Sequence, residues 1–246
     1  MRKAWRQWGL LCAVVWFVGA CAPPKEPIKT NPDGKIQIPA EFTEDGTQVK
    51  FAAEITTDAS TKKQFLMGMG IRKKLGIINI YAMGMYAEPT AAATALAAWK
   101  TADLEKLKTD AAYFTALQTG KFAKTMRLAM VFNVSGDDMA SAFDESIQPR
   151  LKTEAGKAAL AKFRGYFTEP AKDGEELLFS WNEDGSKVFV KLNGTAKEPI
   201  ADADFAQALM AVYLDDKPIS EDAKKNFTNN LKMMFQKAEE AATPKP

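Results

Sequence analysis

The sequence predicts one α+β domain over residues 35–242. Short runs of apolar and β-branched residues are joined in pairs by turn signals, which is typical of β-hairpins. Segments with helix-start residues alternate with these strands. About 205 residues remain after the N-terminal segments, which is the size of one domain, and they contain no internal repeat.

The first half of this domain is expected to contain two hairpins. We expect short strands at residues 35–38 and 49–52, with a turn at 44–46, and a longer hairpin of residues 65–72 and 77–86. Helices should follow at residues 89–99 and 102–117. Pro89 supports the first of these, because proline fits the first position of a helix.

The second half is expected to begin with a strand that carries Met126, Leu128, Met130 and Phe132 on one face. Asp184-Gly185 marks the turn of a later hairpin. The predicted elements are a strand at 124–134, helices at 136–147 and 153–167, hairpin strands at 176–182 and 187–192, and helices at 202–214 and 220–241.

The strand at residues 77–86 is apolar on both faces. An antiparallel strand with one face in water should instead alternate between apolar and polar residues. Both faces of this strand must therefore be covered. Helices are expected on one face, and further protein or an apolar cavity on the other.

Residues 1–20 resemble the signal peptide of a bacterial lipoprotein. Arg2, Lys3 and Arg6 precede an uncharged run at residues 8–20, which is too short to span a bilayer as a helix. The run ends in Val-Gly-Ala-Cys, which resembles a lipobox with Cys21 as the lipidated residue. We therefore expect cleavage before Cys21 and attachment to a membrane through its lipid. An ordinary signal peptide or an uncleaved anchor is the alternative.

Residues 21–34 are expected to form a Pro-rich linker after the lipid anchor. Four prolines separated by polar residues favour an extended spacer. Ala22 follows the lipidated cysteine in place of the aspartate that signals retention in the inner membrane. The expected location is the periplasmic side of a bacterial envelope, at the outer membrane.

The residue inventory excludes several kinds of chemistry. The chain has no histidine, which rules out His-based catalytic triads and imidazole acid–base catalysis. Its two cysteines are Cys12, inside the leader, and Cys21. The mature domain would therefore have neither a disulfide nor a free thiol, and we expect no metal site and no cofactor.

Charge argues against nucleic acid as a partner. Removal of residues 1–20 lowers the number of Lys and Arg residues from 33 to 30, against 31 Asp and Glu, so the mature side chains carry a net charge of −1. A nucleic-acid-binding domain usually carries a basic face or stripe. The mature sequence shows no such run of basic residues.

Five segments together resemble the chalcone isomerase family. They are residues 65–72 (FLMGMGIR), 81–88 (YAMGMYAE), 122–128 (FAKTMRL), 134–136 (VSG) and 213–220 (YLDDKPIS). Their order and spacing match the family over about residues 37–235. The resemblance implies an open-faced β-sandwich, in which a large antiparallel sheet packs on a helical layer with a ligand cleft between them.

The family includes true isomerases and fatty-acid-binding relatives, and the resemblance distinguishes them by their site residues. In the isomerases an Arg, a Thr, a Tyr and an Asn hold and activate the substrate. The matching positions in this sequence are Arg72, Tyr81, Met139 and Ser146. Loss of one donor to a developing oxyanion typically lowers the rate by about 10²–10³. Flavonoid cyclisation is therefore not expected.

Arg72 and Tyr81 instead resemble the pair that holds a carboxylate in the fatty-acid-binding branch. Guanidinium binds carboxylate through charge-assisted hydrogen bonds, and a phenol adds a neutral donor. We expect the adaptable side chains of Met67, Met69, Met83 and Met85 to line the apolar tunnel. The further candidate ligand-binding residues are Asn79, which would share the face of Tyr81, Arg127 and Met139.

The sequence leads to one hypothesis and two alternatives. The leading hypothesis is a lipid-anchored, non-catalytic domain that binds a fatty acid or a similar apolar carboxylate. The first alternative is an intramolecular lyase of unknown substrate that uses Arg72 as its electrophile. The second is a structural envelope domain with a filled cleft. A cavity of about 300–1,000 Å³ that reaches Arg72 would favour binding or catalysis.

Overall fold

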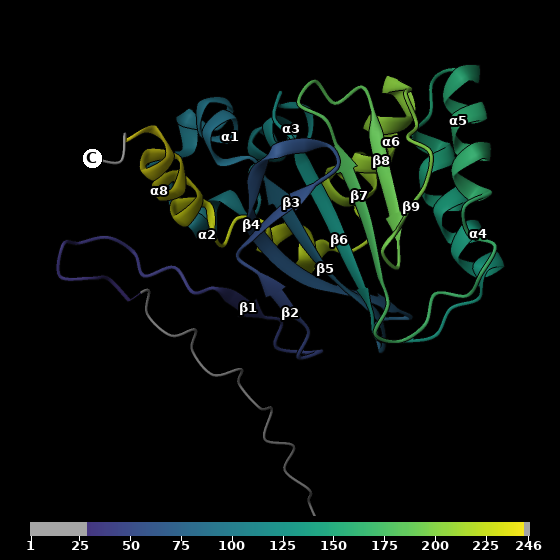
Figure 1. Cartoon of the computed structure of the whole chain (residues 1–246), viewed down its shortest axis with the longest axis horizontal. Helices are drawn as coiled ribbons and strands as arrows, with labels where there is room; N and C mark the ends of the chain where they lie inside the picture. The colour runs from purple at the N-terminus through teal and green to yellow at the C-terminus, as the bar shows by residue number, and fades with distance from the viewer. Residues whose placement is uncertain (1–28, 244–246) are drawn as a thin grey trace, which may run out of the picture.

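The computed structural model describes residues 29–243, and seven of its strands form one sheet (Figure 1). The strand order follows the chain, and every neighbouring pair is antiparallel. The strands are β3 (Glu54–Thr57), β4 (Ser60–Lys74), β5 (Ile78–Ala87), β6 (Lys124–Met130), β7 (Glu176–Trp181), β8 (Val188–Leu192) and β9 (Thr195–Ala196).

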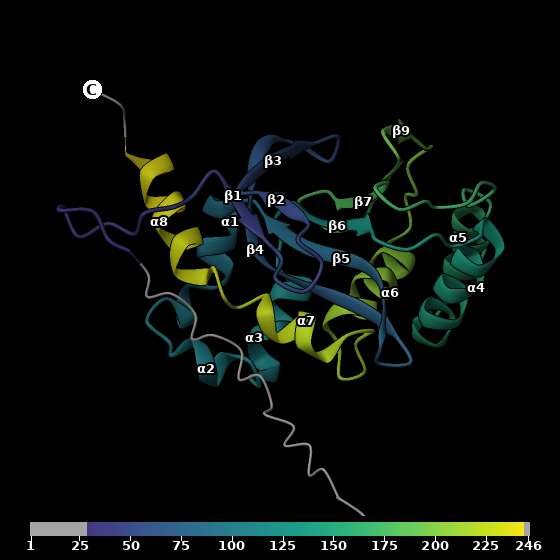
Figure 2. The same cartoon turned by 90° about the horizontal axis from the view of Figure 1, so that it is seen from below.

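Helices cover one face of this sheet, as the two views in Figures 1 and 2 show. The large core lies between the sheet and these helices. The helices are α1 (Pro89–Ala95), η1 (Ala97–Trp99), α2 (Leu104–Leu107), α3 (Ala111–Thr119), α4 (Gly136–Ile147), η2 (Gln148–Arg150), α5 (Glu154–Arg164), α6 (Ala203–Leu214), α7 (Glu221–Asn226) and α8 (Leu231–Ala242). The predicted α+β architecture of a large antiparallel sheet on a helical layer is confirmed.

Glycines in β4 allow α7 to lie directly on the strand. A Cβ at Gly68 would collide with the backbone carbonyl of Asn226, and a Cβ at Gly70 would collide with Ala223. Close approach of two backbones requires the absence of side chains between them. The glycines of the segment at residues 65–72 therefore position the helices that follow α6.

A short hairpin of β1 (Glu41–Thr43) and β2 (Lys50–Ala52) covers the opposite face of the sheet (Figure 2). Phe51 on β2 is fully buried against Leu66, Ala82 and Tyr86 in a second, small core. The hydroxyl of Tyr86 donates a hydrogen bond to the carbonyl of Ala52 at 3.0 Å. Both faces of β5 are thus covered by protein, which is one of the two solutions expected for an all-apolar strand.

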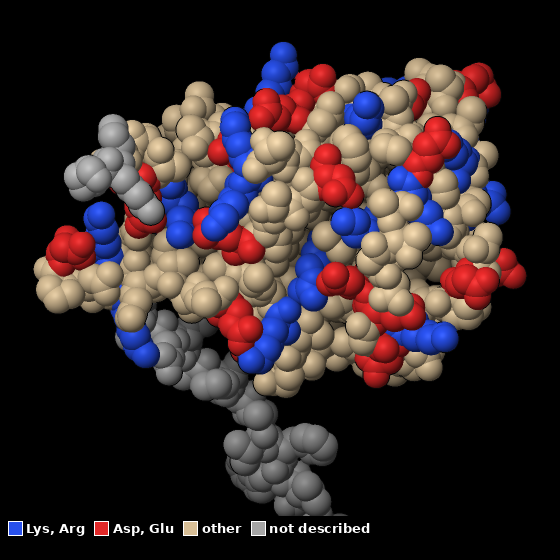
Figure 3. Space-filling view, in the orientation of Figure 1, with Lys and Arg blue, Asp and Glu red and all other residues tan. Residues whose placement is uncertain are grey.

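Arg127 on β6 holds this hairpin, and its predicted role as a ligand-binding residue is wrong. Its Nε donates to Glu176 at 2.7 Å, its Nη1 donates to the carbonyl of Lys50 at 2.9 Å, and its guanidinium lies 4.9 Å from the centre of the Phe51 ring. The side chain therefore points away from the helices. Figure 3 shows Lys and Arg mixed with Asp and Glu over this outer face.

The N-terminal strands differ from the prediction. Residues 35–38 form no strand; Ile36 makes only an isolated bridge to Thr30, and its backbone is held by the side-chain amide of Gln236 on α8. The partner of β2 is β1, a few residues later than predicted. The edge strand β3 was not predicted, because its sequence (EITT) has no apolar alternation.

Two helices predicted as continuous are broken. The segment 102–117 divides at Asp110, whose carboxylate accepts from the backbone of Ala112 and Tyr113 and so begins α3. The segment 220–241 divides before α8. There, the Asn230 backbone and side chain donate to the carbonyls of Met67 and Leu66 at 3.0 and 3.1 Å. A capping residue inside the segment makes the first break, and hydrogen bonds to β4 make the second.

Aromatic side chains fix α4 and α5 against the sheet. Phe143 on α4 and Phe163 on α5 lie 5.4 and 5.5 Å from the ring of Phe179 on β7, in edge-to-face contact. Phe163 also contacts Phe205 on α6 at 5.3 Å. This cluster holds α4 in place as one wall of the cavity described below.

Lys124 is a buried lysine at the start of β6. Its side-chain ammonium donates to the carbonyls of Leu117, Gln118 and Gly120 at 2.9–3.0 Å, which closes the C-terminal end of α3. Burial lowers the pKa of Lys124 to about 7. Because its three partners are backbone carbonyls enclosed in the fold, the group has a structural role.

The depressed pKa of Lys124 predicts a pH-dependent stability. Between about pH 7 and 10.5 the unfolded chain binds a proton that the folded chain has released, so the free energy of unfolding should rise with pH, by up to about 1.4 kcal/mol per unit. Urea denaturation from pH 7.5 to 8.5 measures this slope, because few tyrosines of the unfolded chain ionise in that range. The Lys124→Met variant should lack it, and equal slopes in both proteins would contradict the prediction.

The predicted leader (residues 1–20) and Cys21 lie outside the described residues. Of the predicted linker, residues 29–34 are described, and Gly34 donates its backbone N–H to Asn31 in a turn. Within residues 29–243, no helix is both long enough and apolar enough to span a membrane.

Candidate functional site

A cavity of about 380 Å³ lies between α4 and one end of β4, β5 and β6. It is therefore a cleft between the sheet and the helical layer, where the family resemblance places the ligand. The residues that line it are Arg72, Lys74, Ile80, Tyr81, Phe132, Asn133, Val134, Asp138, Met139, Ser141, Ala142, Phe143, Glu145, Ser146 and Ile219.

Arg72 is half-buried near the end of β4, and its side chain is directed to the helical face of the sheet. Its Nη1 donates a hydrogen bond to the carbonyl of Ile219 at 3.0 Å. Nearby, the Ser220 hydroxyl donates to the carbonyl of Ile71 at 2.9 Å. These bonds attach the α6–α7 connection to β4. Within residues 29–243 Arg72 forms no ion pair, so most of its N–H groups remain available.

Tyr81 is the cross-strand neighbour of Arg72 in the β4–β5 ladder, and both line the cavity. The tyrosine is 4% exposed. Burial raises the pKa of Tyr81, and the adjacent Arg72 guanidinium only partly opposes that rise. At neutral pH the phenol is therefore a protonated donor beside a fixed positive charge.

Asn79 lies outside the cavity, and the prediction that it shares the face of Tyr81 is wrong. Between Arg72 and Lys73, β4 advances one residue while β5 advances two, from Tyr81 to Asn79. Ile80 is thus the extra residue of a β-bulge, which breaks the two-residue alternation. Ile80 and Tyr81 both line the cavity, whereas the Asn79 amide makes a long contact of 3.5 Å with the carbonyl of Gly46.

The predicted methionine-lined tunnel is also wrong. Met67, Met83 and Met85 are at most 1% exposed in the main core, and Met69 packs on the other face, beside Phe51. None of the four lines the cavity. Helices cover this part of the sheet, so the methionines fill the space that a tunnel would need.

Met139 does line the cavity, as predicted from the resemblance, and Ser146 lies about two turns further along α4. The Ser146 hydroxyl donates to the carbonyl of Ala142 at 2.7 Å, within its own helix. Where the isomerases carry a Tyr, this cavity is lined by the thioether of Met139. Where they carry an Asn, it is lined by Ser146, whose hydroxyl is already bonded within the helix.

Charges of both signs border the opening. Arg72 and Lys74 lie on the strand side, and Asp138 and Glu145 lie on the α4 side. The Asp138 carboxylate accepts from the Ser135 hydroxyl at 2.7 Å, which is part of the N-terminal cap of α4. The positive side chains are therefore adjacent to the Tyr81 donor, and the acids are on the opposite wall.

Tyr213 on α6 is a residue that sequence reasoning did not single out. Its hydroxyl is fully buried and has no hydrogen-bond partner in the part of the chain that the structure describes. Burial raises the pKa of Tyr213, and neighbouring Tyr81 raises it further. The sequence contains no sign of this, because Tyr213 lies in a mostly apolar helical segment and resembles an ordinary core residue.

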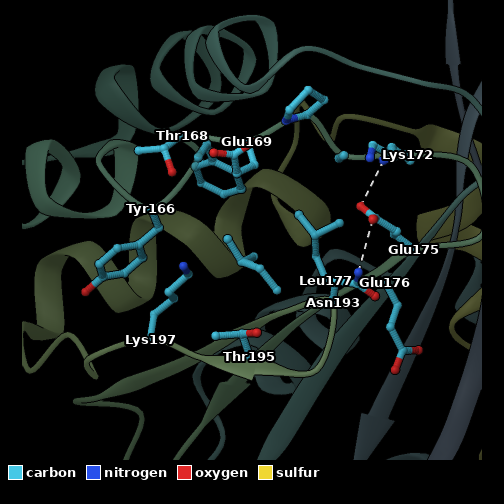
Figure 4. Close-up of a pocket in the computed structure, with 14 residues that line it drawn as sticks. Tyr166, Thr168, Glu169, Lys172, Glu175, Glu176, Leu177, Asn193, Thr195 and Lys197 are labelled. Carbon is cyan, nitrogen blue, oxygen red and sulfur yellow. Dashed lines mark hydrogen bonds between the residues drawn. The ribbon is translucent and has the colours of Figure 1, made fainter.

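A second cavity, of about 350 Å³, lies between the α5–β7 connection and the β8–β9 hairpin (Figure 4). The Glu175 carboxylate accepts from the Lys172 backbone and from the Asn193 amide, both at 3.0 Å. The Tyr166 hydroxyl donates to the carbonyl of Glu198 at 2.6 Å. These polar groups are bonded to one another, and no predicted site residue is among them.

No three His, Cys, Asp or Glu side chains cluster as a metal-binding group within residues 29–243. The candidate site therefore consists of Arg72, Tyr81 and the walls of their cavity. The guanidinium and the protonated phenol place hydrogen-bond donors at one edge of a cavity whose lining is part polar and part apolar.

The profile of the family described as chalcone isomerase-like matches residues 44–227, which is most of the chain. This chain therefore belongs to the chalcone isomerase-like family. The match includes Arg72, Tyr81 and the whole of α4, which contribute to the walls of the cavity.

Named relatives agree with this assignment. The chain is 25% identical to a chalcone–flavanone isomerase of Gentiana triflora over 194 residues, which is 74% of this chain and 88% of that protein. A chalcone–flavanone isomerase of Hordeum vulgare is 28% identical over 76% of this chain and 90% of its own length. The crystal structure of a fatty-acid binding protein of Arabidopsis thaliana has the same fold, with a TM-score of 0.66, 20% identity, and coverage of 80% of this chain and 99% of that one.

Because the buried hydroxyl of Tyr213 has no partner in the described part of the chain, its removal should not lower the free energy of unfolding. A buried donor without a partner costs about 1–3 kcal/mol, so Tyr213→Phe should leave the free energy of unfolding unchanged or raise it. In the matched control, Tyr86→Phe, the bond to Ala52 is lost, and a cost of about 1 kcal/mol is expected. Urea denaturation compares the two. A loss in Tyr213→Phe as large as in the control would mean that the hydroxyl is bonded.

Proposed function

We propose that this protein binds a fatty acid or a similar apolar carboxylate in the cavity between α4 and the sheet, and that it does so without catalysis. The observation that carries the proposal is the pairing of Arg72 and Tyr81 at a cavity of about 380 Å³ that has one apolar wall. This volume lies in the range of small-molecule sites.

The carboxylate would lie between Arg72 and Tyr81. One N–H of Arg72 is bonded to Ile219, which orients the guanidinium and leaves its other donors for a ligand. The buried phenol of Tyr81 keeps its proton and adds a neutral donor. Two fixed donors, one of them charged, match the two oxygens of a carboxylate.

The alkyl chain would lie along the apolar wall of the same cavity. Ile80, Val134, Met139 and Phe143 provide this wall, and Phe143 is held by the aromatic cluster that anchors α4. Apolar contacts favour burial of an alkyl chain in proportion to the area removed from water. The Arabidopsis protein that shares this fold is a fatty-acid binding protein, which supports the same class of ligand here.

The named isomerase relatives support an alternative, an intramolecular lyase on an unknown substrate with Arg72 as the electrophile. The walls of the cavity argue against the isomerase reaction itself. Met139 offers no hydrogen-bond donor, and the Ser146 hydroxyl donates within α4. An enone substrate would thus find fewer donors for its developing enolate charge, and each missing donor typically lowers the rate by about 10²–10³.

The binding proposal predicts that the Arg72→Met variant binds fatty acid more weakly. Charge-assisted hydrogen bonds contribute about 1.5–3 kcal/mol, so the affinity for a fluorescent fatty acid should fall about tenfold to a hundredfold. The matched control is Arg164→Met, because Arg164 is an exposed residue on α5 outside the cavity. This variant should bind the fatty acid as well as the unsubstituted protein does. Fluorescence titration of the purified domain measures all three proteins.

A fatty alcohol of the same chain length separates head-group recognition from a general loss of the pocket. It should bind the unsubstituted protein more weakly than the acid does, and it should bind Arg72→Met about as well as it binds the unsubstituted protein. Equal affinity of the acid for the unsubstituted protein and Arg72→Met would overturn the proposal. Turnover of an enone or phenolic substrate that is lost in Arg72→Met would favour the lyase.

We also propose that the protein is a lipoprotein of the bacterial envelope, anchored through Cys21 and facing the periplasm at the outer membrane. When the full chain is expressed in a diderm bacterium, the mature product should begin at Cys21, carry the mass of a diacylglycerol and partition into detergent. Cys21→Ser should lose both the lipid and the partitioning. An unmodified product cut at another residue would contradict the anchor.

A further inference from the structure

The most exposed large apolar side chains in residues 29–243 gather at one end of the sheet. Leu75 is 84% exposed, Ile77 79%, Phe132 48% and Ile78 38%. Leu75, Ile77 and Ile78 lie in or beside the β4–β5 turn. Phe132 follows Val131, whose backbone N–H donates to Ile80 on the neighbouring strand. The four exposed residues are called the apolar rim below.

The apolar rim has no explanation in the stability of the fold. Leu75 has a positive φ of 53°, a conformation that Asn or Gly adopts at lower cost than Leu. Its side chain is in water, so packing does not offset that cost. Exposed apolar side chains that cluster in one place usually mark a binding surface.

The positive charge beside the apolar rim indicates what kind of surface the rim contacts. Lys73 and Lys74 immediately precede Leu75, both are exposed, and neither forms an ion pair in the described part of the chain. The turn itself, residues 73–78, contains no carboxylate. Protruding apolar side chains with adjacent lysines match the interface of a bilayer, where apolar groups enter the acyl boundary and ammonium groups meet lipid phosphates.

The apolar rim is also continuous with the cavity. Phe132 belongs to both, and Lys74, next to Leu75 in the chain, lines the cavity with Arg72 and Tyr81. With the apolar rim on a bilayer, the opening of the cavity would therefore lie beside the lipid surface. An amphiphile could then pass between bilayer and cavity with little exposure of its alkyl chain to water.

We propose that the apolar rim, with Lys73 and Lys74, docks the domain on an anionic phospholipid surface. Acidic side chains nearby oppose this. Glu44, Glu221 and Asp222 line a neighbouring groove together with Lys73, and Asp138 and Glu145 border the cavity opening. Docking on anionic lipid requires the lysines of the turn to outweigh them, which vesicle composition tests directly. The inference goes beyond ligand binding, and it holds or fails independently of what the cavity binds.

The test uses a chain that begins at residue 29, so that no lipid anchor contributes. All the elements described above and the continuous core lie within residues 29–243, and a cooperative urea transition confirms that this chain is folded. Flotation should show binding to vesicles of phosphatidylcholine mixed with phosphatidylglycerol, weaker binding to phosphatidylcholine alone, and loss of binding in high salt.

Leu75→Asn with Ile77→Thr should lower the partition coefficient on the mixed vesicles by at least about tenfold. Asn suits a positive φ and Thr suits an extended backbone, so the variant should be at least as stable as the parent. Binding of a fluorescent fatty acid in vesicle-free solution should be unchanged, because neither residue lines the cavity.

Lys73→Gln with Lys74→Gln should lower binding to the mixed vesicles about tenfold or more, with little change on phosphatidylcholine. The matched control is Lys62→Gln with Lys63→Gln, two exposed lysines at the other end of β4, which should bind as the parent does. Absence of parent binding, or equal binding by the parent and the Leu75/Ile77 variant, would overturn the proposal. The proposal would also be overturned if the parent were a dimer and the Leu75/Ile77 variant a monomer, because the apolar rim would then be the interface between two copies of the chain.

Discussion

The burial of β5 on both faces is the constraint on which the rest of the structure depends. Met83 and Met85 point to the helices, while Ala82 and Tyr86 point to the β1–β2 hairpin. A Cβ at Gly84 would collide with Phe51, so small residues on the outer face make room for the hairpin. Arg127 then holds the hairpin in place by contacts to Lys50 and Phe51. Several residues that look functional in the sequence are used for this cover.

The candidate site lies at the N-terminal end of β5, where the helices no longer cover the strand completely. The bulge at Ile80 turns two successive side chains, Ile80 and Tyr81, to the helical face. Arg72 meets Tyr81 across the ladder, and α4, held by its aromatic contacts, forms the opposite wall. A closed core and an open cavity therefore share one strand, and their boundary is set by how far the helices extend along it.

Arg72 has a structural role in addition to the binding role that we propose for it. Its bond to Ile219 holds the α6–α7 connection on β4, and the same bond fixes the direction of the guanidinium. A positioned cation beside a buried phenol suits recognition of a resting anion. Stabilisation of a developing enolate needs further donors, and the α4 wall presents Met139 and an internally bonded Ser146 instead.

The sequence by itself determined the α+β class, the long β4–β5 hairpin, the need to cover β5 twice, and the family with its Arg72–Tyr81 pair. These follow from local patterns, because apolar periodicity, turn residues and motif order are properties of neighbouring residues. The tertiary structure alone decided the rest. Asn79 left the site through a one-residue bulge, Arg127 bonded to a hairpin 77 residues away, and the methionines packed under helices from distant segments. Such contacts depend on long-range packing, which sequence periodicity does not encode.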